Sequence, residues 1–200
     1  MSRVIEFHFD FVSPYSYLAN TQLPALARAH GAEVVYKPFR ILELMKLVGN
    51  RPTTIECKNK RRYAGADLGR WAKRYGVGVR QNPHLQKIDT AQLLRGALIA
   101  IDDGQAAPYV SAIFGELWDG DRDLGQTTEV IAALNRAGLN GVKILERAAS
   151  PEAITRLDQA TAAAAERGVF GSPSFFVGDE HFFGNDRLDF VAAALAAQPA

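Results

Sequence analysis

The sequence predicts an α/β fold whose two halves are separated by a long helical insertion. The first forty or so residues follow a strand–helix–strand pattern, and about the last forty return to strands and a closing helix. Between them, apolar residues recur every three to four positions, which is typical of amphipathic helices. We therefore expect residues 1–40 and 168–200 to form one α/β domain and residues 41–167 to form the insertion.

The opening segment contains the first strand–helix–strand unit. Residues 4–11 alternate apolar and polar side chains, which predicts a strand with one apolar face. Residues 15–30 have helical spacing, and Gly31 should end this helix. Pro24 lies inside the helix, so we expect a kink or a break near it. Residues 33–39 are rich in β-branched and aromatic side chains and predict the second strand.

The middle of the chain carries signals for several helices. The pattern TTIE at residues 53–56 is typical of a capping box. Ser150 and Pro151 suit the N-cap and first position of a helix that continues over residues 153–167 and ends at Gly168. The other amphipathic helices are predicted over residues 67–75, 90–102, 108–118 and 128–137.

The final segment is predicted to add a hairpin and a helix. Residues 174–177 and 181–183 read as strands, joined by a glycine-containing turn at residues 178–180. Residues 185–186, Asn-Asp, then suit the cap of a last helix over residues 187–196. This order of elements is that of a thioredoxin-like domain with a helical insertion.

Composition excludes several classes of protein and site. The chain has 23 Lys and Arg against 22 Asp and Glu, so its net charge of +1 gives no global attraction to nucleic acid. The single cysteine, Cys57, excludes an intrachain disulfide and a cysteine-based zinc site, and the four histidines lack metal-ligand spacing. The longest apolar run, residues 190–197, is far shorter than the roughly 18 residues of a membrane span. We expect a cytoplasmic protein without a metal, a membrane segment or a leader.

The junction of the first strand and the first helix carries the first chemical signal. It reads Ser13-Pro14-Tyr15-Ser16, where backbone N–H groups and the helix dipole favour a thiolate. Redox proteins of this fold hold two cysteines with this spacing, but here both positions are serine. The site is therefore inactive, or its thiol comes from another molecule. The alternative is that Ser13 serves only as an N-cap.

Two further signals lie near the C-terminus. Pro173 precedes a predicted strand and leaves neighbouring backbone groups free to pair with another extended chain, although it could simply start an edge strand. Gly184 precedes the cluster Asn185-Asp186-Arg187 at a helix start. A carboxylate beside backbone donors suits a ligand that carries both an ammonium and a carboxylate group. The alternative is that Asn185 and Asp186 only cap the helix.

Together these stretches resemble one known family. The segments FDFVSPYSYLA (residues 9–19), VFGSP (169–173) and FGNDRL (183–188) resemble the 2-hydroxychromene-2-carboxylate isomerases, which belong to the wider DsbA-like and kappa-class glutathione transferase group. The resemblance extends over nearly the whole chain, including DLGRWAKRY at residues 67–75. It implies glutathione as cofactor and an aromatic pyruvate or chromene acid as substrate. A homodimer is one option for the assembly.

The resemblance also implies roles for the glutathione-binding positions. Ser13 matches the serine whose hydroxyl holds the glutathione sulfur. Pro173 matches the cis-proline that faces it, and Ser172 matches the residue whose backbone pairs with the cysteinyl part. The segment that binds the γ-glutamyl end is matched by Phe183, Gly184, Asn185 and Asp186.

The substrate side departs from the family pattern. Lys46 approximately matches a lysine near the substrate carboxylate. The family also places an Asn-Arg pair near the substrate, whereas this chain has TTIE there, including Thr54. We expect Thr54 and His84, which lies in the loop Asn-Pro-His, at the wall of a different acceptor pocket.

The resemblance implies a glutathione-dependent isomerase. It would interconvert 2-hydroxychromene-2-carboxylate and trans-o-hydroxybenzylidenepyruvate, or a related intermediate of aromatic degradation, by reversible thiolate addition. One alternative is a kappa-like glutathione transferase or peroxidase that uses the same thiolate site. The other is a non-catalytic binding protein with a thioredoxin-like fold.

Overall fold

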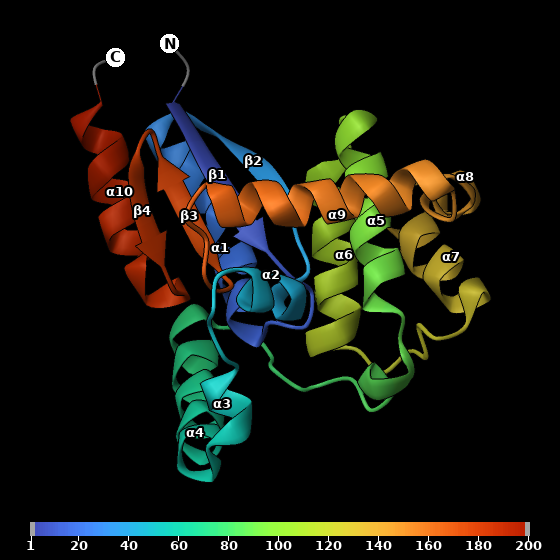
Figure 1. Cartoon of the computed structure of the whole chain (residues 1–200), viewed down its shortest axis with the longest axis horizontal. Helices are drawn as coiled ribbons and strands as arrows, with labels where there is room; N and C mark the ends of the chain where they lie inside the picture. The colour runs from blue at the N-terminus through green and yellow to red at the C-terminus, as the bar shows by residue number, and fades with distance from the viewer. Residues whose placement is uncertain (1–2, 199–200) are drawn as a thin grey trace.

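The computed structural model describes residues 3–198, without the side chain of Ile55. Its centre is a four-stranded mixed sheet in the order β2-β1-β3-β4 (Figure 1). β1 pairs in parallel with β2 and antiparallel with β3, and β3 pairs antiparallel with β4. Strands from the two ends of the chain therefore form one sheet, as predicted. They are β1 (Arg3–Phe9), β2 (Ala32–Pro38), β3 (Ser174–Val177) and β4 (Glu180–Phe183).

The apolar face of β1 forms the centre of the main core. Phe7 stacks on Phe175 of β3 with ring centroids 5.4 Å apart. This face packs against α1 (Pro14–His30) and α10 (Leu188–Ala197). β1 ends two residues earlier than predicted, because the chain turns after Phe9, yet Phe11 stays fully buried. The alternation of apolar and polar residues therefore predicted which side chains are buried, and this burial continues beyond the end of the strand.

Helix α1 runs without interruption through its internal proline. Pro24 lacks the N–H that would bond to the preceding turn. Leu23 and Ala27 on either side are buried in the core, and this packing offsets the missing bond. A break at Pro24 is therefore wrong, and the kink, the other option, stays a prediction. Gly31 ends the helix in the left-handed conformation, with φ of +58°, as predicted.

Every regular element that the structure describes between β2 and β3 is helical. The elements are α2 (Ile41–Leu47), α3 (Thr53–Glu56), α4 (Lys58–Tyr75), η1 (Leu85–Lys87), α5 (Thr90–Asp102), α6 (Ala106–Trp118), α7 (Thr127–Arg136), α8 (Gly141–Ala148) and α9 (Pro151–Glu166). Helices α5 to α8 pack together beside the sheet, and α9 crosses in front of it (Figure 1). Gly96 lets α5 approach Tyr109, because a Cβ there would lie 2.1 Å from the tyrosine oxygen.

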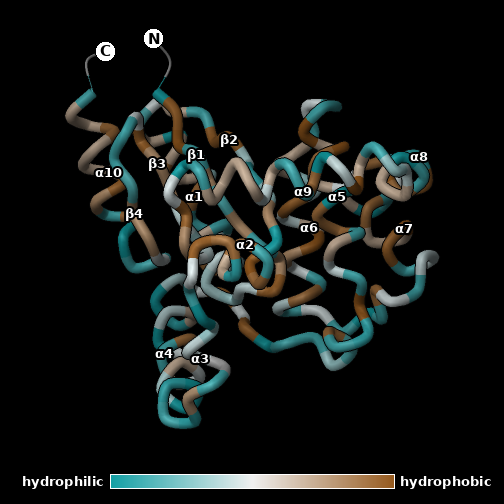
Figure 2. The backbone as a smooth tube through the Cα atoms, in the orientation of Figure 1, coloured by the Kyte–Doolittle hydropathy of each residue, from teal (hydrophilic) through white to brown (hydrophobic). Residues whose placement is uncertain are grey.

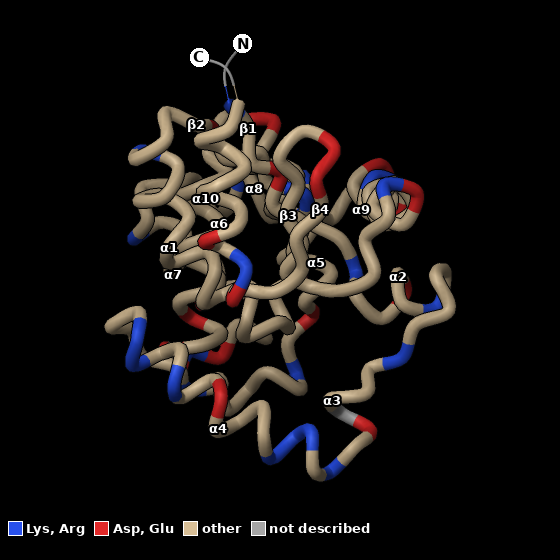
Figure 3. The backbone as a smooth tube through the Cα atoms, turned by 90° about the vertical axis from the view of Figure 1, so that its left-hand side faces the viewer, with Lys and Arg blue, Asp and Glu red and all other residues tan. Residues whose placement is uncertain are grey.

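The segment formed by α3 and α4 extends away from the sheet (Figure 1). Most of its residues are hydrophilic, and Lys and Arg residues occur along it (Figures 2 and 3). The predicted capping box is wrong, because Pro52 occupies the N-cap of α3 and no side chain caps it. α4 begins at Lys58 rather than at residue 67, since its first turns are polar and lack apolar periodicity. Among the described helices, none is long and apolar enough to cross a membrane.

Candidate functional site

Ser13 joins the start of α1 to the loop before β3. It has extended backbone angles as the N-cap, and its Oγ accepts a hydrogen bond from the Ser16 N–H at 3.1 Å. The same hydroxyl donates to the carbonyl oxygen of Ser172 at 3.0 Å. Ser13 is therefore both a helix cap and a half-buried hydroxyl that faces a second loop.

That second loop contains Ser172 and Pro173, joined by a cis peptide bond. The Ser172 and Ser16 hydroxyl oxygens lie 2.7 Å apart, and Ser16 is fully buried. The backbone N–H of Asp10 donates to the Ser172 Oγ at 3.0 Å. Ser16 thus stands where a redox relative of this fold would hold its second cysteine, and its hydroxyl contacts the loop opposite Ser13.

Asp10 is a site residue that the sequence reasoning missed. Its carboxylate is buried and accepts hydrogen bonds from the N–H of Ile41 at 2.8 Å and of Val12 at 3.1 Å. Burial raises the pKa of this carboxyl to about 6, although these bonds oppose the change. The available signal was an aspartate placed between Phe9 and Phe11 at the end of an apolar strand.

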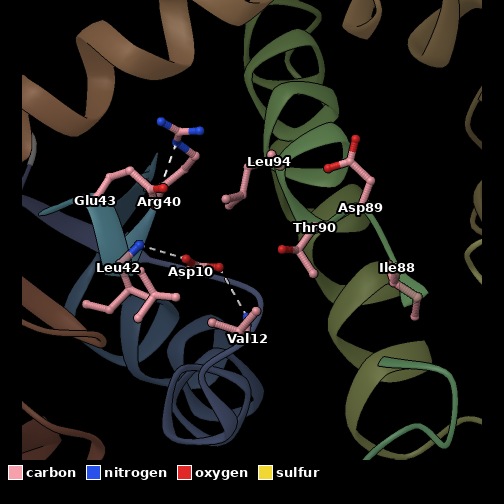
Figure 4. Close-up of a pocket in the computed structure, with 11 residues that line it drawn as sticks. Asp10, Val12, Arg40, Leu42, Glu43, Ile88, Asp89, Thr90 and Leu94 are labelled. Carbon is pink, nitrogen blue, oxygen red and sulfur yellow. Dashed lines mark hydrogen bonds and ion pairs between the residues drawn. The ribbon is translucent and has the colours of Figure 1, made fainter. Parts of the chain in front are cut away.

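A cavity of about 250 Å³ opens beside Asp10 and Val12. One wall is the start of α2 with Arg40 and Glu43, and the opposite wall includes Asp89 (Figure 4). The carboxylates outnumber the one guanidinium in this lining, and Arg40 already has Glu43 within 3.9 Å. The cavity is therefore not arranged to attract an anion.

The segment after β4 is bonded to the proline loop. The Gly184 N–H donates to the Pro173 carbonyl oxygen at 3.0 Å. Gly184 has φ of +103°, and a Cβ there would lie 2.4 Å from an Asp186 carboxylate oxygen, so the position requires glycine. Phe183 is exposed at the end of β4, and its ring lies 4.7 Å from that of Phe170.

Asn185 and Asp186 do not cap the final helix, so that prediction is wrong. They form a short 3₁₀ turn with Arg187, called η2 (Asn185–Arg187), and α10 begins at Leu188 without a side-chain cap. The exposed Asp186 carboxylate pairs instead with the Arg187 guanidinium. Asn185 is buried, and its carbonyl oxygen accepts the Tyr75 hydroxyl at 3.1 Å.

A second cavity, of about 400 Å³, lies where α1, α4 and α10 meet. Trp71 and Tyr75 line it from α4, with Asn185, Asp186 and Asp189 on the other side. The predicted γ-glutamyl segment therefore borders a hollow with an aromatic wall. Trp71 is half-buried, packs against the core and also lines this cavity.

The predicted substrate residues lie in three separate segments. Lys46 is exposed on α2 and Thr54 is exposed on α3. His84 precedes η1, with its Nδ1 atom 4.0 Å from Asp123. None of the three lines either cavity, and over residues 3–198 no hydrogen bond or ion pair joins any two of them. The described residues also contain no group of three or more His, Cys, Asp or Glu that could hold a metal.

Comparison with known proteins identifies the family of this chain. The DsbA-like thioredoxin domain family matches residues 4–196. The chain belongs to this family. It is 36% identical over 196 residues to the 2-hydroxychromene-2-carboxylate isomerase of Sphingobium xenophagum, covering 98% of this chain and 99% of that one. This relationship makes it a member of the isomerase branch of the family and supports an isomerase role.

More distant relatives and a solved structure extend the comparison. Glutathione S-transferase kappa 1 of Homo sapiens is 25% identical, over 98% of this chain and 92% of that one. A solved 2-hydroxychromene-2-carboxylate isomerase superposes with a TM-score of 0.86 at 32% identity, over 96% of this chain and 94% of that one. The thioredoxin-like fold with a helical insertion is therefore confirmed.

Proposed function

We propose that this protein is a glutathione-dependent isomerase of 2-hydroxychromene-2-carboxylate or a related acid from aromatic degradation. The observation that carries the proposal is the Ser13 hydroxyl at the start of α1, facing Ser172 and Pro173. Cys57, the one cysteine of the chain, is exposed just before α4, outside this site. A thiol nucleophile beside Ser13 must therefore come from another molecule. The name of the human kappa-class relative, a glutathione S-transferase, supports glutathione as that molecule.

The donor set at the site fits a thiolate. The first N–H groups of α1 and the helix dipole favour an anion at this position. The negative charge of the Asp10 carboxylate is itself stabilised, because the backbone N–H groups of Val12 and Ile41 donate hydrogen bonds to it. The Ser13 hydroxyl currently donates to a carbonyl oxygen, and rotation about its side-chain bond would let it donate to sulfur instead.

Each residue then has a defined task. Ser13 orients the sulfur and stabilises its negative charge, and the backbone of Ser172 aligns the cysteinyl part. Asp186 binds the γ-glutamyl ammonium group, which competes with Arg187 for this carboxylate. When bound, glutathione would supply a thiolate for reversible addition to the substrate double bond, which would become a rotatable single bond in the ring-opened adduct and form again as the thiolate leaves. Ser13 is thus a group that positions a borrowed nucleophile and does not itself attack.

A kappa-like transferase is the second candidate, because the human kappa enzyme aligns along nearly the full chain. The test uses a chromene carboxylate with reduced glutathione, and with S-methylglutathione as the matched control that lacks a thiol. We expect the two isomers to equilibrate only with reduced glutathione, while both compounds raise the thermal unfolding midpoint. Accumulation of a glutathione conjugate would favour the transferase. No thermal shift and no conversion would favour the non-catalytic binding protein.

A further inference from the structure

Asp10 connects parts of the site that are far apart in the sequence. We propose that Asp10 is a positioning residue: its ionised carboxylate holds the turn that carries Ser13 against the start of the segment that carries Lys46. This inference rests on the proposed function and adds to it a residue that does not touch glutathione or substrate.

The hydrogen bonds of Asp10 reach three segments. One carboxylate oxygen accepts the Val12 N–H in the turn before α1, and the other accepts the Ile41 N–H at the start of α2. The backbone N–H of Asp10 donates to the Ser172 hydroxyl, and its carbonyl oxygen accepts the Ser13 N–H at 3.1 Å. Figure 4 shows the Asp10 side chain between Val12 and the start of α2. One buried residue therefore fixes the relative positions of the turn, α2 and the proline loop.

The Asp10 carboxylate accepts the first N–H of helix α2, which has no side-chain cap of its own. Arg40 is its N-cap residue and makes no side-chain capping bond. Beyond the other end of the helix, the Asn50 side chain donates to the Phe170 carbonyl oxygen at 2.8 Å, just before the proline loop. Lys46 lies between these two attachments. Asp10 at one end and Asn50 at the other therefore tie the helix that carries Lys46 to the Ser13 turn and to the proline loop.

The charge of Asp10 is costly in this setting and needs its two N–H partners. Burial is the main cause of the raised pKa, and the nearby Glu43 carboxylate acts in the same direction. Asp89 faces the same cavity, and the Arg40 guanidinium pairs with Glu43 and Asp158. Protonation would turn one carboxylate oxygen into a hydroxyl, which is a weaker acceptor, so one of the two attachments would weaken.

The variant Asp10→Asn tests the proposal directly. Asparagine has one acceptor oxygen, whereas Asp10 uses both of its oxygens on different segments. We expect kcat/KM at pH 8 to fall about tenfold or more, the size expected for one hydrogen bond to a charged group. A limb of the wild-type pH profile near pH 6 should be absent in the variant. The matched control is Asp89→Asn, which removes a carboxylate from the same cavity and keeps an N-cap for α5.

A nuclear magnetic resonance titration of the wild type adds a readout that needs no variant. The amide signals of Val12 and Ile41 should shift together with a midpoint near pH 6. Independent amide titrations, or a wild-type rate and pH profile in Asp10→Asn, would overturn the proposal.

Glutathione affinity, measured by calorimetry, separates this proposal from the proposed function. If the protein isomerises nothing, yet its glutathione affinity changes near pH 6 only when Asp10 is present, the positioning role stands and the isomerase assignment fails. If the protein is an active isomerase and Asp10→Asn changes neither its rate nor its glutathione affinity, the isomerase assignment stands and the positioning role fails.

Discussion

Two regions next to the candidate site are built very differently. The turn before α1 and the proline loop are held by partly buried hydrogen bonds among Asp10, Ser13, Ser16 and Ser172. The α3–α4 segment is mostly exposed, with Ala72 as its buried residue within the described side chains. It meets the site through a few polar contacts, such as the Tyr75 hydroxyl on Asn185. The chain's own hydrogen bonds thus fix the Ser13 side of the candidate site, while the neighbouring segment can change its surface without disturbing the fold.

This difference predicts where substitutions will have large and small effects. Residues inside this hydrogen-bonded network should affect both chemistry and stability, because their polar groups are partly shielded from water. Residues on the α3–α4 surface should mainly adjust which ligand binds. The substitutions below test this comparison from the strongest expected effect to the weakest.

The largest effect concerns the pH dependence of stability through Asp10. Burial raises its pKa in the native state to about 6, above the value of 3.8 for an exposed aspartate. The native state therefore binds this proton more tightly than the unfolded chain does. The resulting stabilisation is complete below pH 3.8 and is lost as the pH rises through 6.

Asp10→Asn should remove this dependence. The free energy of unfolding of the wild type, relative to the variant, should fall by ~3 kcal/mol between about pH 3.5 and pH 8. Urea unfolding across this range measures the difference. If the free energy of unfolding has the same pH dependence in both proteins, Asp10 does not titrate as a buried group. The contrast between the two regions would then lack its largest predicted effect.

Ser13→Ala should lower turnover more than glutathione affinity. The hydroxyl is expected to stabilise the thiolate as charge develops, and one hydrogen bond to a charged group is worth roughly 1.5–3 kcal/mol. That energy corresponds to about a ten- to hundredfold loss of kcat. Steady-state kinetics and calorimetry separate the two effects, and Ser13→Thr is the control that keeps a hydroxyl. An unchanged kcat with weaker binding would make Ser13 a binding contact only.

The sequence predicted the fold because the informative signals were local. Strand alternation, the Gly31 helix end and the serine-proline starts of α1 and α9 each depend on a few neighbouring residues. The junction with Ser13 and the loop with Pro173 were also found as short motifs. Asp10 was missed because its partner Ile41 is 31 positions away, and no local pattern reports a bond over that distance.

The prediction of the substrate residues also rests on local information. Thr54 and His84 were selected by their place in the chain, and the structure puts them in separate segments, one on α3 and one just before η1. The cap predicted for Asn185 and Asp186 failed because a 3₁₀ turn and the Arg187 guanidinium take up the polar groups there. Local patterns predict how a segment folds, but they do not predict which distant side chain competes for its polar groups.

Asp186→Asn should weaken glutathione binding with little effect on stability. Because Asp186 does not cap α10, its loss removes one surface ion pair, worth about 0–1 kcal/mol. We expect the KM for glutathione to rise about tenfold, since a charge-assisted contact to the ammonium group is lost. The effect should shrink when the γ-glutamyl amine is acetylated. Asp189→Asn, which removes another carboxylate from the same cavity, is the control; equal KM values for Asp186→Asn and wild type would remove Asp186 from the site.

The smallest effect is expected at Thr54, on the exposed side of the comparison. Thr54 lies on the four-residue helix α3, is exposed and contacts neither cavity. Thr54→Ala should therefore change kcat/KM less than about twofold and stability by less than about 0.5 kcal/mol, as is usual for an exposed position. Kinetics with the chromene acid as the varied substrate measures it. A large rise in the KM for this acid, with glutathione affinity unchanged, would show that α3 contacts the bound substrate. The exposed α3–α4 segment would then be part of the substrate-binding site.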